Sequence, residues 1–546
     1  MPTIELSRKD LEKLCGKKFS AKELEEALMF VKGEIDSSEG DSLKVDVKET
    51  NRPDLWSAEG IAREINGRLG KRKGIPQYKI GKSGLTVKIE ESVKEARPLT
   101  VAAVVKGVKV SNDLLVQLIQ LQEKVSGTFG RKRKEAAIGV YDFDKIKGNI
   151  RYYGAKPREK KFVPLEFKNE MNLDEIIEMH PKGKEFGHLL KGKKLYPIFE
   201  DSKGNVLSMP PIINSDYSGK VTEKTTNLFV EVSGFNIETL NTALNVMVMA
   251  LADRGGKIEG VSMVDSNGKK FVTPNFGTKK ISLEIEYVKK VSGLNLGEKE
   301  IISLLEKAGY EVGEKGKKLG LEYGNFRSDV LHAVDVVEDV LIGYGYNRIR
   351  PERARLSVVG SELGETAFID KVRDVCVGLG LQEVLTFVLT SKEKQGRMIG
   401  LEGQEFVEIA NPISLNWSIM RKNIFPEMLE FLSKNKHYEY PQKIFEVGKT
   451  IEIDPKSDSR TKEKNVLCIA LSGKDYGFTS IKSAFEAVCR ELGKKCAVKP
   501  LKHPSFEEGK SAEISGDSKG FFGEIRPVIR ENFGLQYPVV ILEMEL

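Results

Sequence analysis

The sequence predicts a multidomain protein of the α+β class. Its 546 residues exceed what one hydrophobic core usually organises, so the length favours roughly three to four domains. A hydrophobic content of 40% with 31% charged residues is typical of a folded chain. Helical and alternating patterns follow one another without an internal repeat. We expect domains at residues 1–84, 85–274, 275–352 and 360–546.

The first two segments mix both kinds of element. Residues 1–84 contain helical patterns, RKDLEKLCG and AKELEEALMFVKG, an alternating strand, LKVDVKET, and a lysine- and glycine-rich stretch at 71–84 that predicts a linker. In residues 85–274, TVAAVVKGVKV and NLFVEVSG are typical of strands. NIETLNTALNVMVMALADRGG is typical of a helix that ends at a double glycine.

The last two segments continue the mixture. Residues 275–352 hold a predicted strand, ISLEIEYVKKVSG, a helix, GEKEIISLLEKAGYEVG, and a second helix that is acidic. From about 360 onward, helices alternate with predicted strands such as FVEIANP, KIFEVGKTIEI and NVLCIALSG.

Composition narrows the functional classes. A net charge of +7 is compatible with a nucleic-acid partner, but a lysine-rich solvated surface explains it equally well. The five cysteines form no C-x-x-C pair and the five histidines no H-E-x-x-H pair, which indicates reduced thiols and disfavours a zinc enzyme. No signal peptide is evident, and the longest apolar run, NVMVMALA, is too short for a membrane span. We therefore expect a cytoplasmic protein without a membrane partner.

The stretch FRSDVLHAVDVVEDVLIGYGY, residues 326–346, concentrates negative charge in a basic chain. Helical periodicity predicts a core face on one side of this helix. The core face comprises Val334, Val336, Val337, Val340 and Leu341. The same periodicity places Asp335, Glu338 and Asp339 on the opposite face, with Asp329 in the turn before the helix.

Such clustering of carboxylates has a cost. Like charges at this spacing destabilise an isolated helix by roughly 0.2–0.5 kcal/mol per pair, and Arg327 and Arg348 are expected outside the acidic face. A hard cation such as Mg²⁺ would reverse that cost, because it binds carboxylate oxygens and retains waters. Four oxygen ligands without His or Cys argue against zinc. The alternative is an ordinary amphipathic helix with a solvated acidic side.

The acidic stretch resembles a domain of phenylalanine–tRNA ligase beta subunits, in which carboxylates of this spacing bind magnesium beside the alpha subunit. Other stretches agree in the same order along the chain: NRPDLWSAEGIARE, AIGVYDFDKIKGNIRYYGA, LSMPPIINSDYSGKVTEKTTNLFVEVSG, NPISLNWSIMRKNIFPEMLEFLSKN and GEIRPVIRENFGL. The resemblance covers nearly the whole chain and follows the shorter archaeal and eukaryotic-cytosolic form. It implies magnesium ligands at Asp329, Asp335, Glu338 and Asp339.

The resemblance also assigns the segments. It implies a mixed α/β editing domain of the tRNA-binding B3/B4 type at 85–274 and a small helical, magnesium-binding domain of the B5 type at 275–352. It also implies a non-catalytic class II synthetase-like core at 360–546, with an antiparallel sheet flanked by helices. It implies an alpha2 beta2 heterotetramer that charges tRNA(Phe) with phenylalanine, using ATP and Mg²⁺.

We expect the synthetic site on the alpha subunit and no catalytic residue for aminoacylation in this chain. A class II core needs arginines to hold ATP phosphates, and none follows KIFEVGKTI before Pro455. We predict that Arg421 is a packing or interface residue.

The implied editing reaction hydrolyses tyrosine mistakenly attached to tRNA(Phe). A hydrophobic pocket rejects an added hydroxyl only weakly, so an editing pocket must present a polar group that recognises the tyrosine OH. Strand alternation puts Glu231 on one face with Phe229 and Ser233. An ordinary solvent-facing glutamate would follow the same pattern, but the family resemblance favours Glu231 as the recognising group.

The loop SMPPIINSD precedes this strand. Asn214 and Ser215 are candidates to hold the ester or the attacking water, with Thr225 and Asn227 near the start of the strand. The alternative is a simple Asx or Ser turn. With no Ser–His–Asp or Cys–His set evident, we expect a water positioned by polar groups and by the terminal hydroxyl of the RNA.

Two further features remain open. Gly139 stands where bacterial editing domains have a histidine, so the bacterial pocket does not transfer as a whole. The basic run at 131–134 could attract the tRNA backbone or form a solvated charge cluster.

The competing hypothesis for the whole chain is a non-enzymatic nucleic-acid-binding scaffold, because residues 276–352 resemble a small helical DNA-binding module.

Overall fold

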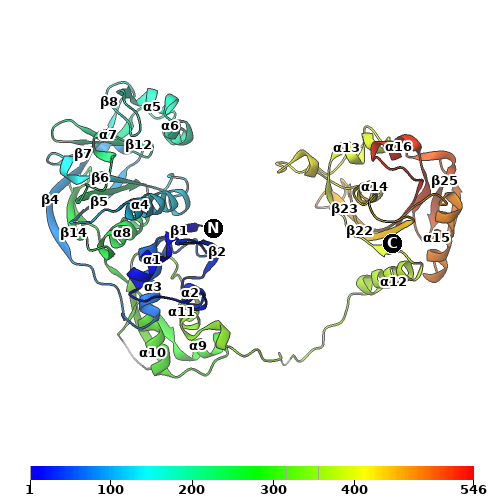
Figure 1. Ribbon diagram of the computed structural model, residues 1–546, viewed down its shortest axis with the longest axis horizontal. Coiled ribbons are helices and arrows are strands. Elements are labelled where there is room, and N and C mark those ends of the chain that lie inside the picture. The colour runs from blue at the N-terminus through cyan, green and yellow to red at the C-terminus, as the bar shows by residue number, and fades with distance from the viewer. Residues whose placement is uncertain (1, 314–315, 355) are drawn as a thin grey trace. The chain divides into compact units, whose positions relative to one another are not determined.

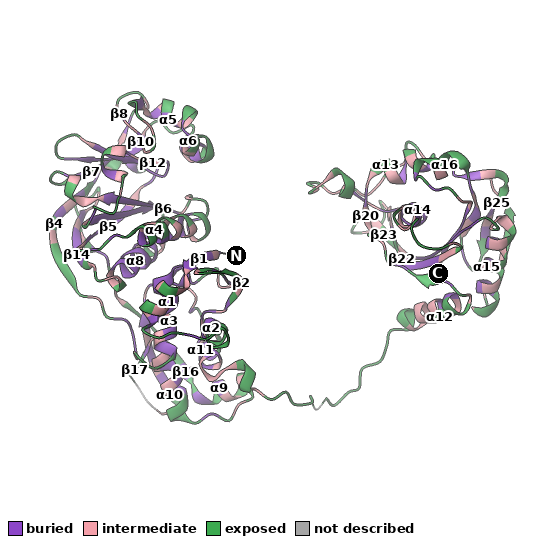
Figure 2. Ribbon diagram, in the orientation of Figure 1, coloured by how far each residue is buried: buried purple, intermediate pink, exposed green. Residues whose placement is uncertain are grey.

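The computed structural model describes residues 2–313, 316–354 and 356–546 (Figure 1). It separates into two compact units, Met1–Glu352 and Arg353–Leu546, which we call unit 1 and unit 2. Both contain helices and sheets, which confirms the prediction of a multidomain α+β protein. Buried segments concentrate in the strands and on the helix faces that cover them (Figure 2).

Unit 1 begins with a small antiparallel sheet in the order β1-β3-β2 and three helices. The elements are β1 (Thr3–Ser7), α1 (Arg8–Cys15), α2 (Ala21–Leu28), β2 (Gly33–Glu39), β3 (Ser42–Val47) and α3 (Ala58–Arg68). The helices start where short polar side chains cap free N–H groups: Ser7 accepts from Asp10 N, and Ser57 accepts from Gly60 N. Arg254, just after a later helix, pairs with Asp10 and Glu59 and ties this part to the central sheet.

The centre of unit 1 is a mixed sheet in the order β12-β11-β10-β7-β4-β14-β5-β13-β6, with β15 paired to β14. Its strands are β4 (Ile80–Ile89), β5 (Leu99–Lys106), β6 (Ala136–Asp142), β7 (Ile150–Ala155), β10 (Tyr196–Asp201), β11 (Val206–Met209), β12 (Ile213–Asn214), β13 (Leu228–Gly234), β14 (Lys257–Val264) and β15 (Lys270–Thr273). Strand β4 runs parallel to β14 and β7. Strand β4 begins inside the stretch 71–84 that was predicted to be a linker. The prediction is wrong for the end of that stretch, because residues 80–82 pair with β14.

Helices cover the central sheet and its outer end. They are α4 (Asn112–Lys124), α5 (Leu173–Met179), α6 (Pro181–Phe186), α7 (Asp216–Gly219) and α8 (Ile237–Asp253); a short ladder joins β8 (Lys161–Phe162) to β9 (Met171–Asn172). Leu228 and Val230 of β13 pack in the same core as α8, whereas Phe229 packs on the other face with Tyr141. This confirms the alternation predicted for the strand.

The last part of unit 1 is an antiparallel sheet in the order β16-β18-β17 with three helices, so the expectation of a small helical domain is wrong: its helices pack on a sheet. Its elements are β16 (Thr278–Glu284), α9 (Ile285–Ser292), α10 (Glu298–Lys307), β17 (Tyr310–Val312), β18 (Lys318–Gly324) and α11 (Ala333–Tyr344). The predicted strand ISLEIEYVKKVSG is wrong in its second half, which forms α9. In α11, Val336, Val337 and Val340 are buried as predicted, but Val334 is 43% exposed because it lies in the first turn.

Unit 2 is built on a sheet in the order β19-β22-β23-β27-β26-β25-β24, antiparallel except at the β19–β22 edge. Its strands are β19 (Gln382–Glu383), β22 (Gln442–Ile453), β23 (Thr461–Ser472), β24 (Cys496–Pro500), β25 (Phe506–Gly516), β26 (Gly520–Ile525) and β27 (Val539–Glu545). Strands β22 and β23 confirm two predicted strands. FVEIANP forms only an isolated bridge, Glu408–Ile419, so that strand prediction is wrong.

Helices flank both faces of this sheet. Helices α12 (Gly364–Gly378) and α15 (Phe478–Glu491) share one core with it, and α14 (Phe425–Lys434) and α16 (Pro527–Asn532) share the other. A short ladder, β20 (Leu389–Thr390) with β21 (Ile419–Met420), and helix α13 (Lys392–Gln395) complete the unit. Across the described parts of the chain, no helix is both long and apolar enough to cross a membrane.

Candidate functional site

A cavity of about 430 Å³ lies at the β6 edge of the central sheet. The two ends of the sheet approach one another here, since Asn214 Nδ2 in β12 donates to Val140 O in β6 at 3.2 Å. Apolar side chains from α4, β6 and the Pro210–Pro211 loop form much of the wall: Leu115, Leu118, Ile138, Val140, Pro211 and Ile212. Polar groups include Gln122, Arg133, Asn214 and Glu231. The lining also includes charged side chains, Glu123, Glu166, Lys182, Asp216 and Lys220. A cleft with a mainly apolar wall and several polar groups is typical of a small-molecule site.

Glu231 is the most unusual of these polar groups. It lies in the middle of β13, opposite Gly139 of β6, and is only 2% exposed. Its Oε1 accepts from Tyr141 Oη at 3.1 Å, whereas its buried Oε2 has no hydrogen-bond partner among the described residues. Burial raises the pKa of Glu231 to about 8, against the opposing effects of Tyr141 and Arg97. The alternative of a solvent-facing glutamate is therefore wrong.

The nearby Arg97 is also buried. Its Nε donates to Ser233 Oγ at 3.0 Å and its Nη1 to Lys134 O at 3.2 Å. Burial lowers the pKa of Arg97 to about 10. Its guanidinium bonds to neutral oxygens instead of to Glu231, which leaves that carboxyl without a direct counter-ion.

The other predicted editing residues divide between the cavity and its surroundings. Asn214 lines the cavity together with Glu231. Ser215 Oγ lies 3.3 Å from Ser218 Oγ, Thr225 Oγ1 donates to Asp142 at 3.3 Å, and Asn227 Nδ2 donates to Asp144 at 2.9 Å. These three side chains lie outside the cavity lining.

The sequence reasoning missed the groups that shape the pocket. Tyr141 Oη lies 2.7 Å from Ser208 Oγ, which links β6 to β11. Arg133, at φ 64°, turns inward from the basic run and donates to Pro211 O and Ile212 O. It thus fastens the cavity wall, whereas Arg131, Lys132 and Lys134 are exposed. An arginine within a basic run carried no signal for this role.

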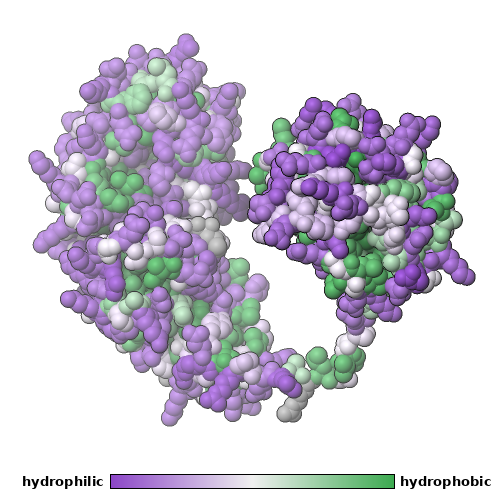
Figure 3. All heavy atoms as spheres, turned by 45° about the vertical axis from the view of Figure 1, so that its right-hand side comes forward, coloured by the Kyte–Doolittle hydropathy of each residue, from purple (hydrophilic) through white to green (hydrophobic). Residues whose placement is uncertain are grey.

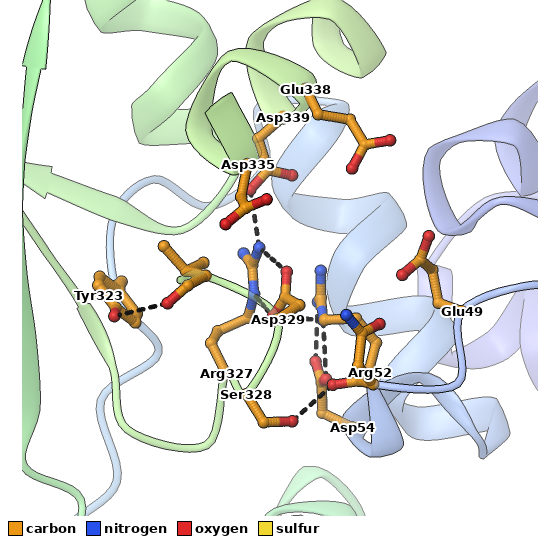
Figure 4. Close-up of polar contacts among 12 residues, drawn as sticks. Glu49, Arg52, Asp54, Tyr323, Arg327, Ser328, Asp329, Asp335, Glu338 and Asp339 are labelled. Atoms are coloured by element: carbon orange, nitrogen blue, oxygen red, sulfur yellow. Dashed lines mark hydrogen bonds and ion pairs between the residues drawn. The ribbon is translucent and has the colours of Figure 1, made fainter. Parts of the chain in front are cut away.

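The acidic residues of α11 and its preceding turn gather at a second, charged site (Figure 4). Arg327 Nε donates to Asp329 Oδ1 at 2.7 Å, and its Nη2 donates to Asp339 Oδ2 at 2.7 Å. Arg68 of α3 also donates to Asp339, from Nη2 to Oδ1 at 2.5 Å. Burial opposes ionisation of Asp339, but Arg327 and Arg68 hold its pKa below the usual range.

These contacts correct two expectations. Asp339 is 4% exposed and faces arginines, so the alternative of a solvated acidic side is wrong for this residue. Arg327 was expected outside that face, yet it bridges Asp329 and Asp339. The remaining pair is more open: Asp335 Oδ2 accepts from Leu331 N and His332 N, and Glu338 pairs with Lys32 while 49% of its side chain is exposed.

The fit of these residues to magnesium is partial. Residues 2–313, 316–354 and 356–546 contain no group of three or more His, Cys, Asp or Glu side chains placed to hold a metal ion. Asp329 and Asp339 already accept from guanidinium groups, which leaves little capacity for a cation. Asp335 and Glu338 are the more open pair, and Mg²⁺ that retains most of its waters is often bound through one or two carboxylates. Such an ion would have to replace Lys32 as the partner of Glu338.

In unit 2, Arg421 is almost fully buried. Its Nη2 lies 2.7 Å from Glu446 Oε1, its Nε donates to Lys449 O at 2.9 Å, and its Nη1 donates to Thr386 Oγ1 at 2.8 Å. These contacts are those of a packing residue, as predicted.

Comparisons with known families cover most of the chain. Residues 105–249 match the B3/4 domain, residues 281–346 the tRNA synthetase B5 domain, and residues 351–546 the phenylalanyl tRNA synthetase beta chain CLM domain.

Full-length relatives agree. A phenylalanine–tRNA ligase beta subunit of Pyrococcus horikoshii is 47% identical, covering 100% of this chain and 99% of its own length. The corresponding subunit of Archaeoglobus fulgidus is 37% identical, covering 100% and 98%. A crystal structure of an N-terminal fragment of the phenylalanyl-tRNA synthetase beta subunit from Pyrococcus horikoshii is 50% identical, with a TM-score of 0.61, covering 63% of this chain and 100% of the fragment.

The matched domains define a component of an aminoacyl-tRNA ligase. More narrowly, the chain belongs to the family of phenylalanine–tRNA ligase beta subunits. The competing hypothesis of a non-enzymatic scaffold is not favoured by these relatives.

Proposed function

We propose that this chain works with an alpha subunit that charges tRNA(Phe), and that its own cavity hydrolyses tyrosine mistakenly attached to that tRNA. The observation that carries the proposal is the unpartnered, buried Oε2 of Glu231 in a largely apolar cavity. A phenolic hydroxyl would satisfy that oxygen. Phenylalanine would leave it unpaired and cut off from water, at a cost of about 1–3 kcal/mol.

The proposed chemistry needs a positioned water more than a nucleophile. An aromatic ring seated against the apolar wall would be shielded from bulk water, which would strengthen its hydrogen bond to Glu231. Asn214 uses one N–H on Val140 O and retains a second N–H and an acceptor oxygen for the ester or the attacking water. Ser215, Thr225 and Asn227 are assigned supporting roles around the loop that carries Asn214.

The domain roles follow the same proposal. Residues 85–274 form the editing domain, 275–352 the B5-type domain, and 360–546 a class II synthetase-like core without its own charging site. The complex, in the cytoplasm and with alpha2 beta2 composition, uses ATP and Mg²⁺. We assign Asp335 and Glu338 to Mg²⁺, where the ion would offset the repulsion between the two carboxylates; Asp329 and Asp339 would act beside them through their arginine pairs.

Unit 2 offers a surface for the alpha subunit. Large apolar side chains are exposed between residues 385 and 417: Leu385, Phe387, Ile413, Leu415 and Trp417. Phe387 and Trp417 meet edge to face, with ring centroids 5.1 Å apart. Apolar areas on the surface of unit 2 are visible in Figure 3. Clustered exposed apolar side chains of this kind are typical of a protein interface.

Reconstitution tests the division of labour. The isolated chain with ATP, phenylalanine and tRNA(Phe) should form no charged tRNA, and addition of the alpha subunit should restore charging. Phenylalanyl-tRNA made by the isolated chain would overturn the proposal.

A matched pair of variants tests editing. In the complex, Glu231→Gln should slow deacylation of tyrosyl-tRNA(Phe) about tenfold, the effect of one lost buried hydrogen bond. Glu200→Gln is the control, because Glu200 is a buried carboxylate of the same sheet that does not line the cavity. Equal deacylation by both variants and the wild type would remove Glu231 from this role.

A further inference from the structure

The orientation of Glu231 depends on a side chain that sequence reasoning did not single out. Tyr141, in β6, is completely buried and lies near Glu231 across the β6–β13 ladder. Its Oη is 3.1 Å from Glu231 Oε1 and 2.7 Å from Ser208 Oγ. Because Tyr141 engages Oε1, Oε2 is the oxygen left without a hydrogen-bond partner among the described residues, and Glu231 is one of the residues that line the cavity.

The three polar groups form an ordered chain. A phenol has one proton to donate; Glu231 Oε1 needs a donor from outside its own group, whereas the serine hydroxyl can rotate and become a donor itself. The Tyr141 proton therefore serves Glu231, while the rotatable Ser208 hydroxyl donates to Tyr141 Oη. Since Ser208 lies in β11 and Tyr141 in β6, the chain also joins the two ends of the curled sheet.

Gly139 provides the room for this arrangement. It pairs directly opposite Glu231 in the β6–β13 register. A Cβ atom at residue 139 would lie 2.3 Å from Tyr141 Oη and 2.6 Å from Glu231 Oε1, closer than atoms can approach. A side chain at this position would therefore separate the phenol from the carboxyl.

We propose that Tyr141 is a positioning residue that holds Glu231 through Oε1 and leaves Oε2 without a protein partner, so that the pocket prefers a ligand with a phenolic hydroxyl over its unhydroxylated analogue. Tyr141 need not touch the ligand. Without its hydroxyl, Glu231 can rotate and bond elsewhere with both oxygens, and the preference for the hydroxylated ring declines.

This inference rests on the proposed function, and two measurements separate them. The first is deacylation of tyrosyl- and phenylalanyl-tRNA(Phe) by the complex with the alpha subunit. The second is calorimetric binding of L-tyrosine and L-phenylalanine to the full chain, which needs no hydrolysis. Tyr141→Phe should lower the tyrosine-over-phenylalanine preference about tenfold in both, the size of one buried hydrogen bond.

The fold offers a close control. Tyr153 Oη donates to Glu200 Oε2 at 2.8 Å, which makes a second buried tyrosine–glutamate pair in the same sheet, away from the cavity. Unlike Glu231, Glu200 also has a cationic partner, Lys160. Tyr153→Phe should leave the preference unchanged. If Tyr141→Phe does not fold, Ser208→Ala removes the far end of the chain and should lower the preference by a smaller factor, about threefold.

The outcomes are distinct. A tyrosine preference in binding without deacylation by the wild type would overturn the proposed function and leave the role of Tyr141 to be decided by its variant. A wild type that binds and deacylates both amino acids equally would overturn the inference. So would a folded Tyr141→Phe chain with the wild-type preference in both measurements, or an equal loss in Tyr153→Phe.

Discussion

Two carboxylates of unit 1, Glu231 and Asp339, are buried to almost the same extent, but their pKa values are shifted in opposite directions. Asp339 accepts from Arg68 and Arg327, which together hold its pKa low against the effect of burial. Glu231 bonds only to a neutral phenol on one oxygen, and burial raises its pKa to about 8. The first environment suits a group that stabilises the fold. The second suits a group that awaits a ligand.

The largest expected effect comes from breaking the charged site. Asp339→Asn removes the shared partner of two buried arginines, so the free energy of unfolding of unit 1 should fall by about 3–5 kcal/mol. Chemical denaturation of the full chain measures it. Glu338→Gln is the control on the same helix, because its pair with Lys32 is half-exposed and should contribute less than about 1 kcal/mol. Equal losses in the two variants would contradict the difference between paired and open carboxylates.

The raised pKa of Glu231 predicts how the stability of the protein depends on pH. The folded-state pKa of Glu231 exceeds its usual value of 4.5, so the stability contributed by its neutral form is present at low pH and is lost as pH rises toward about 8. Glu231→Gln should therefore lose less stability than the wild type between pH 5 and 9, by at least about 1.4 kcal/mol, the value of one pKa unit. Thermal or urea unfolding at several pH values measures this.

A second buried carboxyl also changes the stability over this pH range, and its contribution must be subtracted. Burial raises the pKa of Glu543 in unit 2 to about 7. Only the difference between the wild type and Glu231→Gln isolates Glu231. Parallel pH profiles for these two proteins would show that Glu231 is not a neutral buried acid.

The smallest effect concerns magnesium. If Mg²⁺ binds Asp335 and Glu338, it should stabilise the wild type by about 1 kcal/mol at five times its dissociation constant. The double variant Asp335→Asn with Glu338→Gln should lose that increment and should associate with the alpha subunit less tightly in magnesium. Identical stability and association of both proteins with magnesium and with a chelator would exclude this assignment.

Local patterns predicted the parts of the molecule that local forces determine. The alternation in NLFVEVSG put Glu231 on the face of Phe229, and helical periodicity identified the buried Val336, Val337 and Val340. It did not identify the exposure of Val334, because α11 begins at Ala333 and its first turn is not yet covered. The family resemblance, more than spacing, selected Asn214 and Glu231.

The features that the sequence patterns did not predict depend on contacts between residues far apart in the chain. Arg68 and Asp339 are separated by 271 positions, and Tyr141 and Ser208 by 67, so no local pattern joined them. The same holds for β4, whose glycines and lysines are typical of a linker until β14 supplies hydrogen-bond partners. Such pairings follow from the tertiary fold, which periodicity does not encode.

The bond between Arg68 and Asp339 limits how the molecule can be divided. Helix α3 carries the arginine and α11 the aspartate, although the B5-type segment follows the whole central sheet along the chain. If residues 275–352 were expressed alone, Asp339 would lack Arg68, one of its two arginine partners. The segment is therefore not an independent folding unit. A chimera that contains it would also need residues 52–68.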